Sequence, residues 1–78
     1  DPMITVKLYG LLRVESGIRE LQVQADTWKD LYQKLEQAGL KKQDLKGCYV
    51  MQNGAAKTRT SKLKDGDVVQ LLPPVAGG

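Results

Sequence analysis

The sequence predicts an α+β domain in which a mixed sheet of four or five strands packs against one main helix. Two repeats of apolar residues carry this prediction. In residues 4–9 apolar and polar side chains alternate, which is the period of a strand with one buried face. In residues 28–38 apolar side chains recur at intervals of three and four, as they do on one face of a helix. Short strands that precede and follow one helix along the chain are typical of the α+β class.

The first strand is expected to end at Gly10, and residues 11–17 are expected to form a loop with a turn at Ser16-Gly17. Apolar and polar residues alternate again in Glu20–Gln24, so the first two strands should form a hairpin. Thr27 stands three residues before Asp30, which is the spacing of a capping box at the start of a helix.

After the helix, Gly39 suits the left-handed position that often follows a last turn. Residues 40–47 are expected to be a lysine-rich connector, residues 48–52 a short strand, and Asn53-Gly54 a tight turn. Another short strand is expected within residues 55–61. Val68–Leu72 is apolar at four of five positions, which favours a strand inside the sheet, next to the first strand.

The length of 78 residues allows one domain, which we assign to residues 3–74. Met3 is taken as the natural start, with residues 1–2 as an addition, and residues 75–78 as a flexible C-terminal tail. No apolar run approaches the roughly 18 residues of a membrane span, and no signal peptide is recognised. A cytoplasmic protein that does not contact a membrane is therefore expected.

The composition argues against a self-contained active site or metal centre. The chain has no histidine, the usual general base and a common ligand of transition metals. Its one cysteine, Cys48, lies in an apolar run and is expected to be a buried, inert thiol. No glycine-rich phosphate loop is present. We therefore expect no metal site and no bound cofactor.

Basic residues are concentrated in the second half of the chain. Residues 40–78 carry seven basic and three acidic side chains, against five and six in residues 1–39. Such a surface could favour an acidic or phosphate-bearing partner, although a solvated and solubilising surface is the simpler interpretation. The basic residues of this half are Lys41, Lys42, Lys46, Lys57, Arg59, Lys62 and Lys64.

The C-terminal residues, Pro-Pro-Val-Ala-Gly-Gly at positions 73–78, have the features of a reactive end. The two prolines favour an extended exit, and the last four residues can reach about 13–14 Å when extended. Gly77 and Gly78 lack Cβ atoms, so they can enter a slot that excludes side chains. Such an end can present a carboxylate to the active site of another protein, whereas the alternative is a frayed terminus.

A carboxylate is a poor electrophile, so its use requires activation by an adenylating enzyme that supplies ATP and magnesium. A sulfur nucleophile would then convert the acyl-adenylate to a thiocarboxylate, whereas an amine would give an isopeptide conjugate. The residues themselves leave these two fates open.

The chain resembles the MoaD- and ThiS-type sulfur carriers, which share the ubiquitin-like β-grasp fold. The resemblance spans nearly all of residues 3–78. It rests on residues 6–13 (Val-Lys-Leu-Tyr-Gly-Leu-Leu-Arg), the helix that follows Thr27, Asn53-Gly54, residues 63–69 (Leu-Lys-Asp-Gly-Asp-Val-Val) and the ending at residues 72–78.

This resemblance implies that Gly78 is adenylated by a MoeB- or ThiF-like enzyme and becomes a thiocarboxylate with sulfur from a donor enzyme. In molybdenum cofactor biosynthesis the small subunit of molybdopterin synthase then donates sulfur to precursor Z inside a MoaE-like large subunit. Pro74, Val75, Ala76 and Gly77 would fill the channel of that partner. The chain would not be an enzyme by itself.

Phenylalanine is absent, and residues 55–62 are more basic than is usual in these carriers, which leaves the pathway open. A ubiquitin-like modifier conjugated through Gly78 and a carrier for tRNA thiolation are alternatives within the resemblance. A binding module that meets RNA or an acidic protein through its basic half is an alternative of another class, although nucleic acid is not the expected partner.

Overall fold

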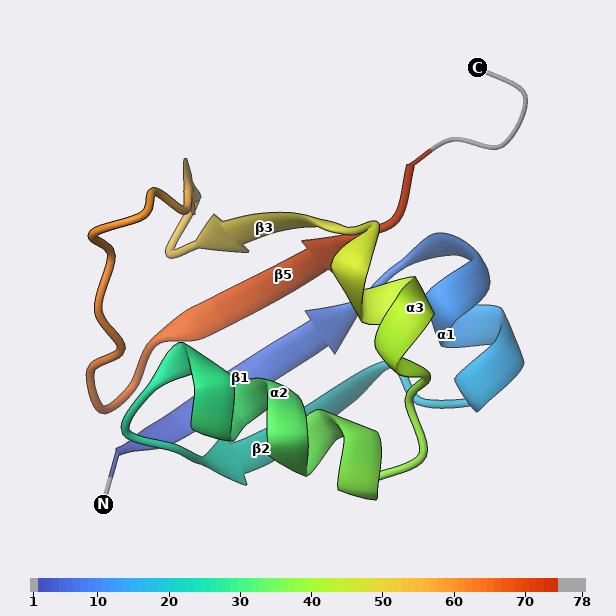
Figure 1. The fold of residues 1–78 in the computed structure, drawn as a ribbon, viewed down its shortest axis with the longest axis horizontal. Coiled ribbons are helices and arrows are strands. Elements are labelled where there is room, and N and C mark those ends of the chain that lie inside the picture. The colour runs from blue at the N-terminus through green and yellow to red at the C-terminus, as the bar shows by residue number, and fades with distance from the viewer. Residues whose placement is uncertain (1, 75–78) are drawn as a thin grey trace.

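A computed structural model describes residues 2–74 of the chain. In this part three helices accompany a five-stranded sheet with the strand order β2-β1-β5-β3-β4 (Figure 1). The predicted mixed sheet with one main helix, α2, is confirmed. The elements are β1 (Met3–Leu8), α1 (Gly10–Ser16), β2 (Glu20–Gln24), α2 (Trp28–Gln37), α3 (Lys42–Lys46), β3 (Tyr49–Gln52), β4 (Ala55–Ala56) and β5 (Val68–Leu72).

The first and last strands lie side by side in the middle of the sheet. They run parallel, with Val6 opposite Val69 and Leu8 opposite Leu71. The strand β2 pairs with the other edge of β1, and β3 pairs with the other edge of β5, both in antiparallel orientation. The expected position of the last strand is therefore confirmed, and β5 ends within the sheet with a neighbour on each side.

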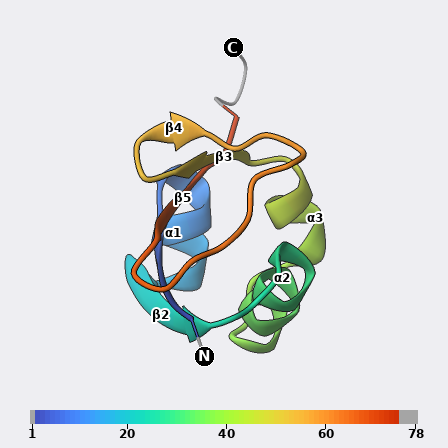
Figure 2. The same cartoon turned by 90° about the vertical axis from the view of Figure 1, so that its left-hand side faces the viewer.

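The core lies between the sheet and α2, which covers one face of the sheet (Figure 2). The alternation in β1 turns Ile4, Val6 and Leu8 into this core, while the residues between them stay partly exposed. Leu31 and Leu35 meet them from the apolar stripe of α2. The periods of the strand and the helix thus supply the two sides of one aliphatic core.

The start of α2 follows the sequence signal. The Thr27 side-chain oxygen accepts a hydrogen bond from the backbone N–H of Asp30 at 3.1 Å, which satisfies a donor of the first turn. Trp28 packs against the edge of the core, and its indole Nε1 donates to the carbonyl of Ser61 at 2.9 Å. After the helix Gly39 has a φ of 108°, a value that side chains disfavour.

Two segments expected to be irregular are short helices. Residues 11–17 were expected to form a loop, but α1 occupies most of them and is followed by the cap residue Gly17, whose φ of 73° is left-handed. Residues 40–47 were expected to be a connector, yet they contain α3. Each helix buries one residue, Leu12 in α1 and Leu45 in α3. A single buried position produces no helical repeat, so the sequence pattern gave no signal.

Asp67 is a buried carboxylate that joins the turn at residues 64–67 to Gln52 at the end of β3 and to Asn53 directly after it. One carboxylate oxygen accepts from Gln52 Nε2 and from the backbone N–H of Lys64, each at 2.8 Å, and the other accepts from Asn53 Nδ2 at 2.8 Å. Burial alone raises the pKa of this carboxyl. The hydrogen bonds from Asn53, Gln52 and Lys64 outweigh burial, so the pKa of Asp67 lies below its usual value.

We expect Asp67→Asn to lower the free energy of unfolding at pH 7 by about 1–3 kcal/mol, because an amide cannot accept all three bonds. The folded pKa of Asp67 is lowered, so its stabilisation is complete above the unfolded pKa of about 3.9 and is lost as pH falls through the folded value. Urea unfolding between pH 7 and 3 should therefore show the two proteins converging. The exposed Asp26→Asn is the control, and a difference that stays constant with pH would contradict this assignment.

Candidate functional site

The C-terminal residues follow a strand that is held on both sides. Val69 and Leu71 of β5 are fully buried, and the strand pairs with β1 and with β3. The end of β5 lies at the end of the sheet where α1 and α3 also lie (Figure 1). Pro73 is half-buried and Pro74 is exposed. The segment beyond Pro74 therefore starts from a fixed base.

Two glycines, Gly10 and Gly47, border this base. A Cβ atom at Gly10 would lie 3.0 Å from Cγ of Pro73, and Gly10 has a φ of +60°. A Cβ atom at Gly47 would lie 3.9 Å from Cδ of Pro74, which is ordinary contact. At Gly10 both the limited space beside Pro73 and the left-handed backbone conformation favour glycine, and Pro73 packs against this residue.

Exposed apolar side chains gather at the same end of the molecule. Within residues 2–74 the large apolar side chains with high exposure are Leu11 at 60%, Val14 at 71% and Tyr49 at 70%. Leu11 and Val14 are one turn apart on α1, directly after Gly10, and Tyr49 pairs with Leu72 at the end of β5. We call Leu11, Val14 and Tyr49 the exit surface. Exposed apolar side chains around a chain exit are suited to contact with another protein.

The structure describes only one of the predicted site residues. Pro74 lies at the base described above. The expected flexible tail, Val75, Ala76, Gly77 and Gly78, lies outside the described residues. The sequence did not predict a role for Gly10 or for the exit surface. A signal was present, since Leu11 and Val14 are apolar residues in a segment expected to be a loop.

The chemistry available in residues 2–74 is limited. No group of three His, Cys, Asp or Glu side chains is placed there to hold a metal ion. The same residues contain no helix whose length and apolar character would let it cross a membrane.

Cys48 was expected to be buried, but it is half-buried, and its thiol donates to the backbone carbonyl of Asp44 at 3.2 Å. Burial raises the pKa of the Cys48 thiol, and the charge of Asp44 raises it further. The group is therefore a thiol at neutral pH rather than a reactive thiolate, in keeping with the expected inert character.

The basic residues of the second half fall on two separate parts of the fold. Lys42 and Lys46 belong to α3 and Lys41 is its N-cap, and this helix lies at the end of the sheet where β5 ends (Figure 1). The others follow β4, where Lys57 Nζ lies 4.9 Å from the ring centroid of Trp28. The lysines of α3 are therefore placed to meet whatever protein contacts the end of β5.

Comparison with the sequence patterns of known protein families shows which family the chain belongs to. The pattern of the ThiS family matches residues 6–78, from β1 to the last residue. The chain belongs to the ThiS family. This is a family of small ubiquitin-like sulfur carriers that are not themselves catalysts. A comparison with curated protein sequences gives no match.

Solved structures agree with this ThiS-family assignment. One matching structure is a complex of subunits 1 and 2 of the molybdopterin-converting factor from Helicobacter pylori. The matched chain of that complex is 31% identical to this chain, with a TM-score of 0.74, and the match covers 97% of this chain and 99% of that one. SAMP1 from Haloferax volcanii is 26% identical with a TM-score of 0.76, over 97% and 99%. Urm1 from Sulfolobus solfataricus, at 23% identity and a TM-score of 0.67 over 90% and 99%, shares the fold. The expected β-grasp fold is confirmed.

We expect Gly10→Ala to disturb the base of the C-terminal segment in this ThiS-family chain. The left-handed backbone should lower stability by about 1–2 kcal/mol, and the new Cβ should displace Pro73. Gly17→Ala is a matched control, because Gly17 also has a left-handed φ, of +73°, but no atom lies within 4 Å of the added Cβ. Amide chemical shifts of Leu71 and Leu72 should move in the first variant only. Equal shifts in both variants would contradict direct contact with Pro73.

Proposed function

We propose that this chain is a sulfur carrier whose C-terminal Gly78 is adenylated, converted to a thiocarboxylate and used to donate sulfur. We further propose that it serves as the small subunit of molybdopterin synthase in molybdenum cofactor biosynthesis. The observation that carries the proposal is the ThiS-family match, which extends to Gly78 itself. The similarity to a molybdopterin-converting factor solved as a complex of two subunits supports the second part.

The geometry supports a donated end. The central strand β5 fixes the base, Gly10 seats Pro73, and the exit surface offers apolar contacts around the point of exit. A partner can therefore hold the domain by the exit surface while the last residues enter its active site. A large subunit similar to MoaE would receive the thiocarboxylate in this way.

The chemistry requires components that other proteins supply. A MoeB- or ThiF-like enzyme with magnesium and ATP would join AMP to the carboxylate of Gly78 and release pyrophosphate. A persulfide on the sulfur-donor enzyme would displace AMP to form an acyl disulfide. A thiol would then cleave that disulfide, so that the thiocarboxylate leaves and a new disulfide remains. The part of this chain that does the chemistry is its terminal carboxyl group.

Conjugation to lysine is the second candidate function. It is favoured by the similarity to the small archaeal modifier protein SAMP1, which is 26% identical over nearly the whole chain. Both functions begin with the same acyl-adenylate, and an amine takes the place of the persulfide in the second. A carrier role in tRNA thiolation would share the thiocarboxylate and differ in the acceptor.

The test combines the purified protein with a MoeB-like adenylating enzyme, magnesium-ATP and a persulfide donor. Intact-mass spectrometry should show replacement of one oxygen by sulfur, and fragmentation should place the sulfur on Gly78. Sulfur found on Cys48 would instead make the chain a persulfide carrier. Isopeptide links from Gly78 to cellular lysines, with no thiocarboxylate, would replace the proposal by the modifier function.

A further inference from the structure

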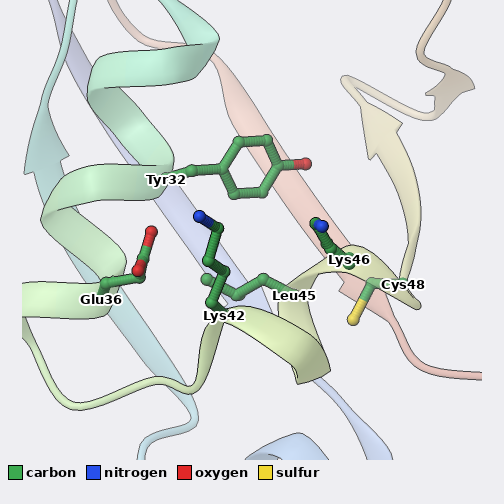
Figure 3. Close-up of a pocket in the computed structure, with 6 residues that line it drawn as sticks. All are labelled: Tyr32, Glu36, Lys42, Leu45, Lys46 and Cys48. Carbon is green, nitrogen blue, oxygen red and sulfur yellow. The ribbon is translucent and has the colours of Figure 1, made fainter.

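A cavity of about 300 Å³ lies between α2 and the α3–β3 segment (Figure 3). This volume is at the lower end of the roughly 300–1,000 Å³ found for ligand pockets, and it suits a single apolar group. Tyr32 and Glu36 reach it from α2, while the other lining residues come from α3 and from Cys48, directly before β3. Its lining residues are Tyr32, Glu36, Lys42, Leu45, Lys46 and Cys48.

The interior of this α2–α3 pocket is apolar and uncharged. Leu45 is buried, and Tyr32 and Cys48 are partly buried against the core. Burial raises the pKa of Tyr32, with a further contribution from Cys48, and burial together with Asp44 raises the pKa of Cys48. Both groups are therefore neutral at pH 7, and the interior can accept an apolar side chain without burying a charge.

The rim of the pocket carries an excess of positive charge. Lys42 and Lys46 are exposed and four residues apart on α3, and Glu36 lies on the α2 side of the pocket (Figure 3). Like charges at this spacing slightly destabilise a helix. The ion pair found in residues 2–74 is Lys34–Asp30, which involves neither lysine. A carboxylate brought to the rim would relieve the repulsion between the two lysines.

The pocket adjoins the base of the C-terminal segment. Gly47 stands between Lys46 and Cys48 of the lining, and a Cβ atom at Gly47 would lie 3.9 Å from Pro74 Cδ. Tyr49 of the exit surface directly follows Cys48 of the pocket lining. A protein that covers the exit surface and takes up the C-terminal residues is therefore in position to reach the pocket as well.

We propose that the α2–α3 pocket receives one apolar side chain, flanked by carboxylates, from the adenylating enzyme that activates Gly78. This rests on the proposed function, and the adenylating enzyme is the partner because both fates of Gly78 begin with adenylation. The apolar side chain fills the space lined by Tyr32, Leu45 and Cys48, while the carboxylates meet Lys42 and Lys46. In such an interface the buried apolar side chain contributes affinity, and the complementary charges at the rim contribute specificity.

The chemistry of the pocket can be tested with capped tripeptides on the ¹⁵N-labelled full chain. Acetyl-Glu-Phe-Asp-amide should produce saturable shifts at the amides of Tyr32, Leu45 and Cys48. Acetyl-Glu-Ala-Asp-amide and acetyl-Lys-Phe-Lys-amide should bind at least about tenfold more weakly, because one lacks the anchor and the other is repelled by the rim. Shifts elsewhere, or equal binding of the three peptides, would overturn the proposal. Phenylacetate binding as tightly as the first peptide would also overturn it, by indicating a small-molecule site.

The role in partner binding is tested in the sulfur-transfer assay with the double variant Lys42→Glu/Lys46→Glu. The carrier concentration at half-maximal rate should rise at least about tenfold, with the maximal rate unchanged, because reversed charges repel the acidic partner segment. Arg19→Glu/Lys29→Glu changes net charge equally at exposed sites and should match the wild type. If the two double variants behave alike, the pocket proposal fails while sulfur transfer by the wild type still supports the carrier function. If the wild type takes up no sulfur, the carrier function and the pocket's stated partner both fail.

Discussion

Replacing Gly78 with tryptophan is expected to abolish thiocarboxylate formation. The proposed reaction requires the terminal carboxylate to enter a slot of the adenylating enzyme that admits a chain without side chains. An indole at the last position blocks that entry, so neither the acyl-adenylate nor the thiocarboxylate can form. Intact-mass spectrometry after incubation with the adenylating enzyme, magnesium-ATP and a persulfide donor should show the wild-type shift and none in the variant.

The control for this experiment places the same large side chain elsewhere. Gln37→Trp lies at the exposed end of α2 and should retain the sulfur shift. The melting temperatures of Gly78→Trp and the wild type should agree, because Gly78 lies beyond the last strand. A Gly78→Trp protein that still acquires sulfur at its terminus would show that no narrow slot operates, and the proposed mechanism would fail.

Much of the fold could be predicted because its main elements carry their own periodic signals. The alternation around Val6 gave β1, and the spacing of Leu31 and Leu35 gave α2, since each pattern reflects a face turned toward the core. Thr27 marked the start of the helix through a local hydrogen bond to Asp30. The apolar run of Val68–Leu72 indicated an inner strand, and the pairing with β1 and β3 shows why.

The features that were missed depend on contacts between distant parts of the chain. The helix α3 buries only Leu45, so no repeat in the sequence marks it. Gly10 matters because Pro73 packs over it, and 62 intervening residues separate the two. The α2–α3 pocket likewise joins Tyr32 to Cys48. The reactive end could be predicted from local composition, whereas its base and the adjoining pocket required the three-dimensional arrangement.

Leu35→Ala is expected to lower the free energy of unfolding by about 2–5 kcal/mol. Leu35 is fully buried on α2, where it packs in the cluster that contains Ile4, Val6 and Leu71. Truncation removes buried apolar surface and leaves a cavity that a small aliphatic core can fill only in part. A total stability of roughly 5–15 kcal/mol is usual for a domain, so this single change should remove a large fraction of it. Urea unfolding followed by far-ultraviolet circular dichroism would measure the change.

Leu11→Ala provides the matched control, because it removes the same atoms from a side chain that is 60% exposed on α1. Its effect on the free energy of unfolding should stay within about 0.5 kcal/mol, as for most surface substitutions. In the sulfur-transfer assay Leu11→Ala should have the larger effect of the two variants. Leu11→Ala removes part of the exit surface and should weaken productive binding, whereas folded Leu35→Ala keeps that surface and should react normally. Similar losses of stability in the two variants would contradict both the assignment of Leu35 to the core and the exposure of the exit surface.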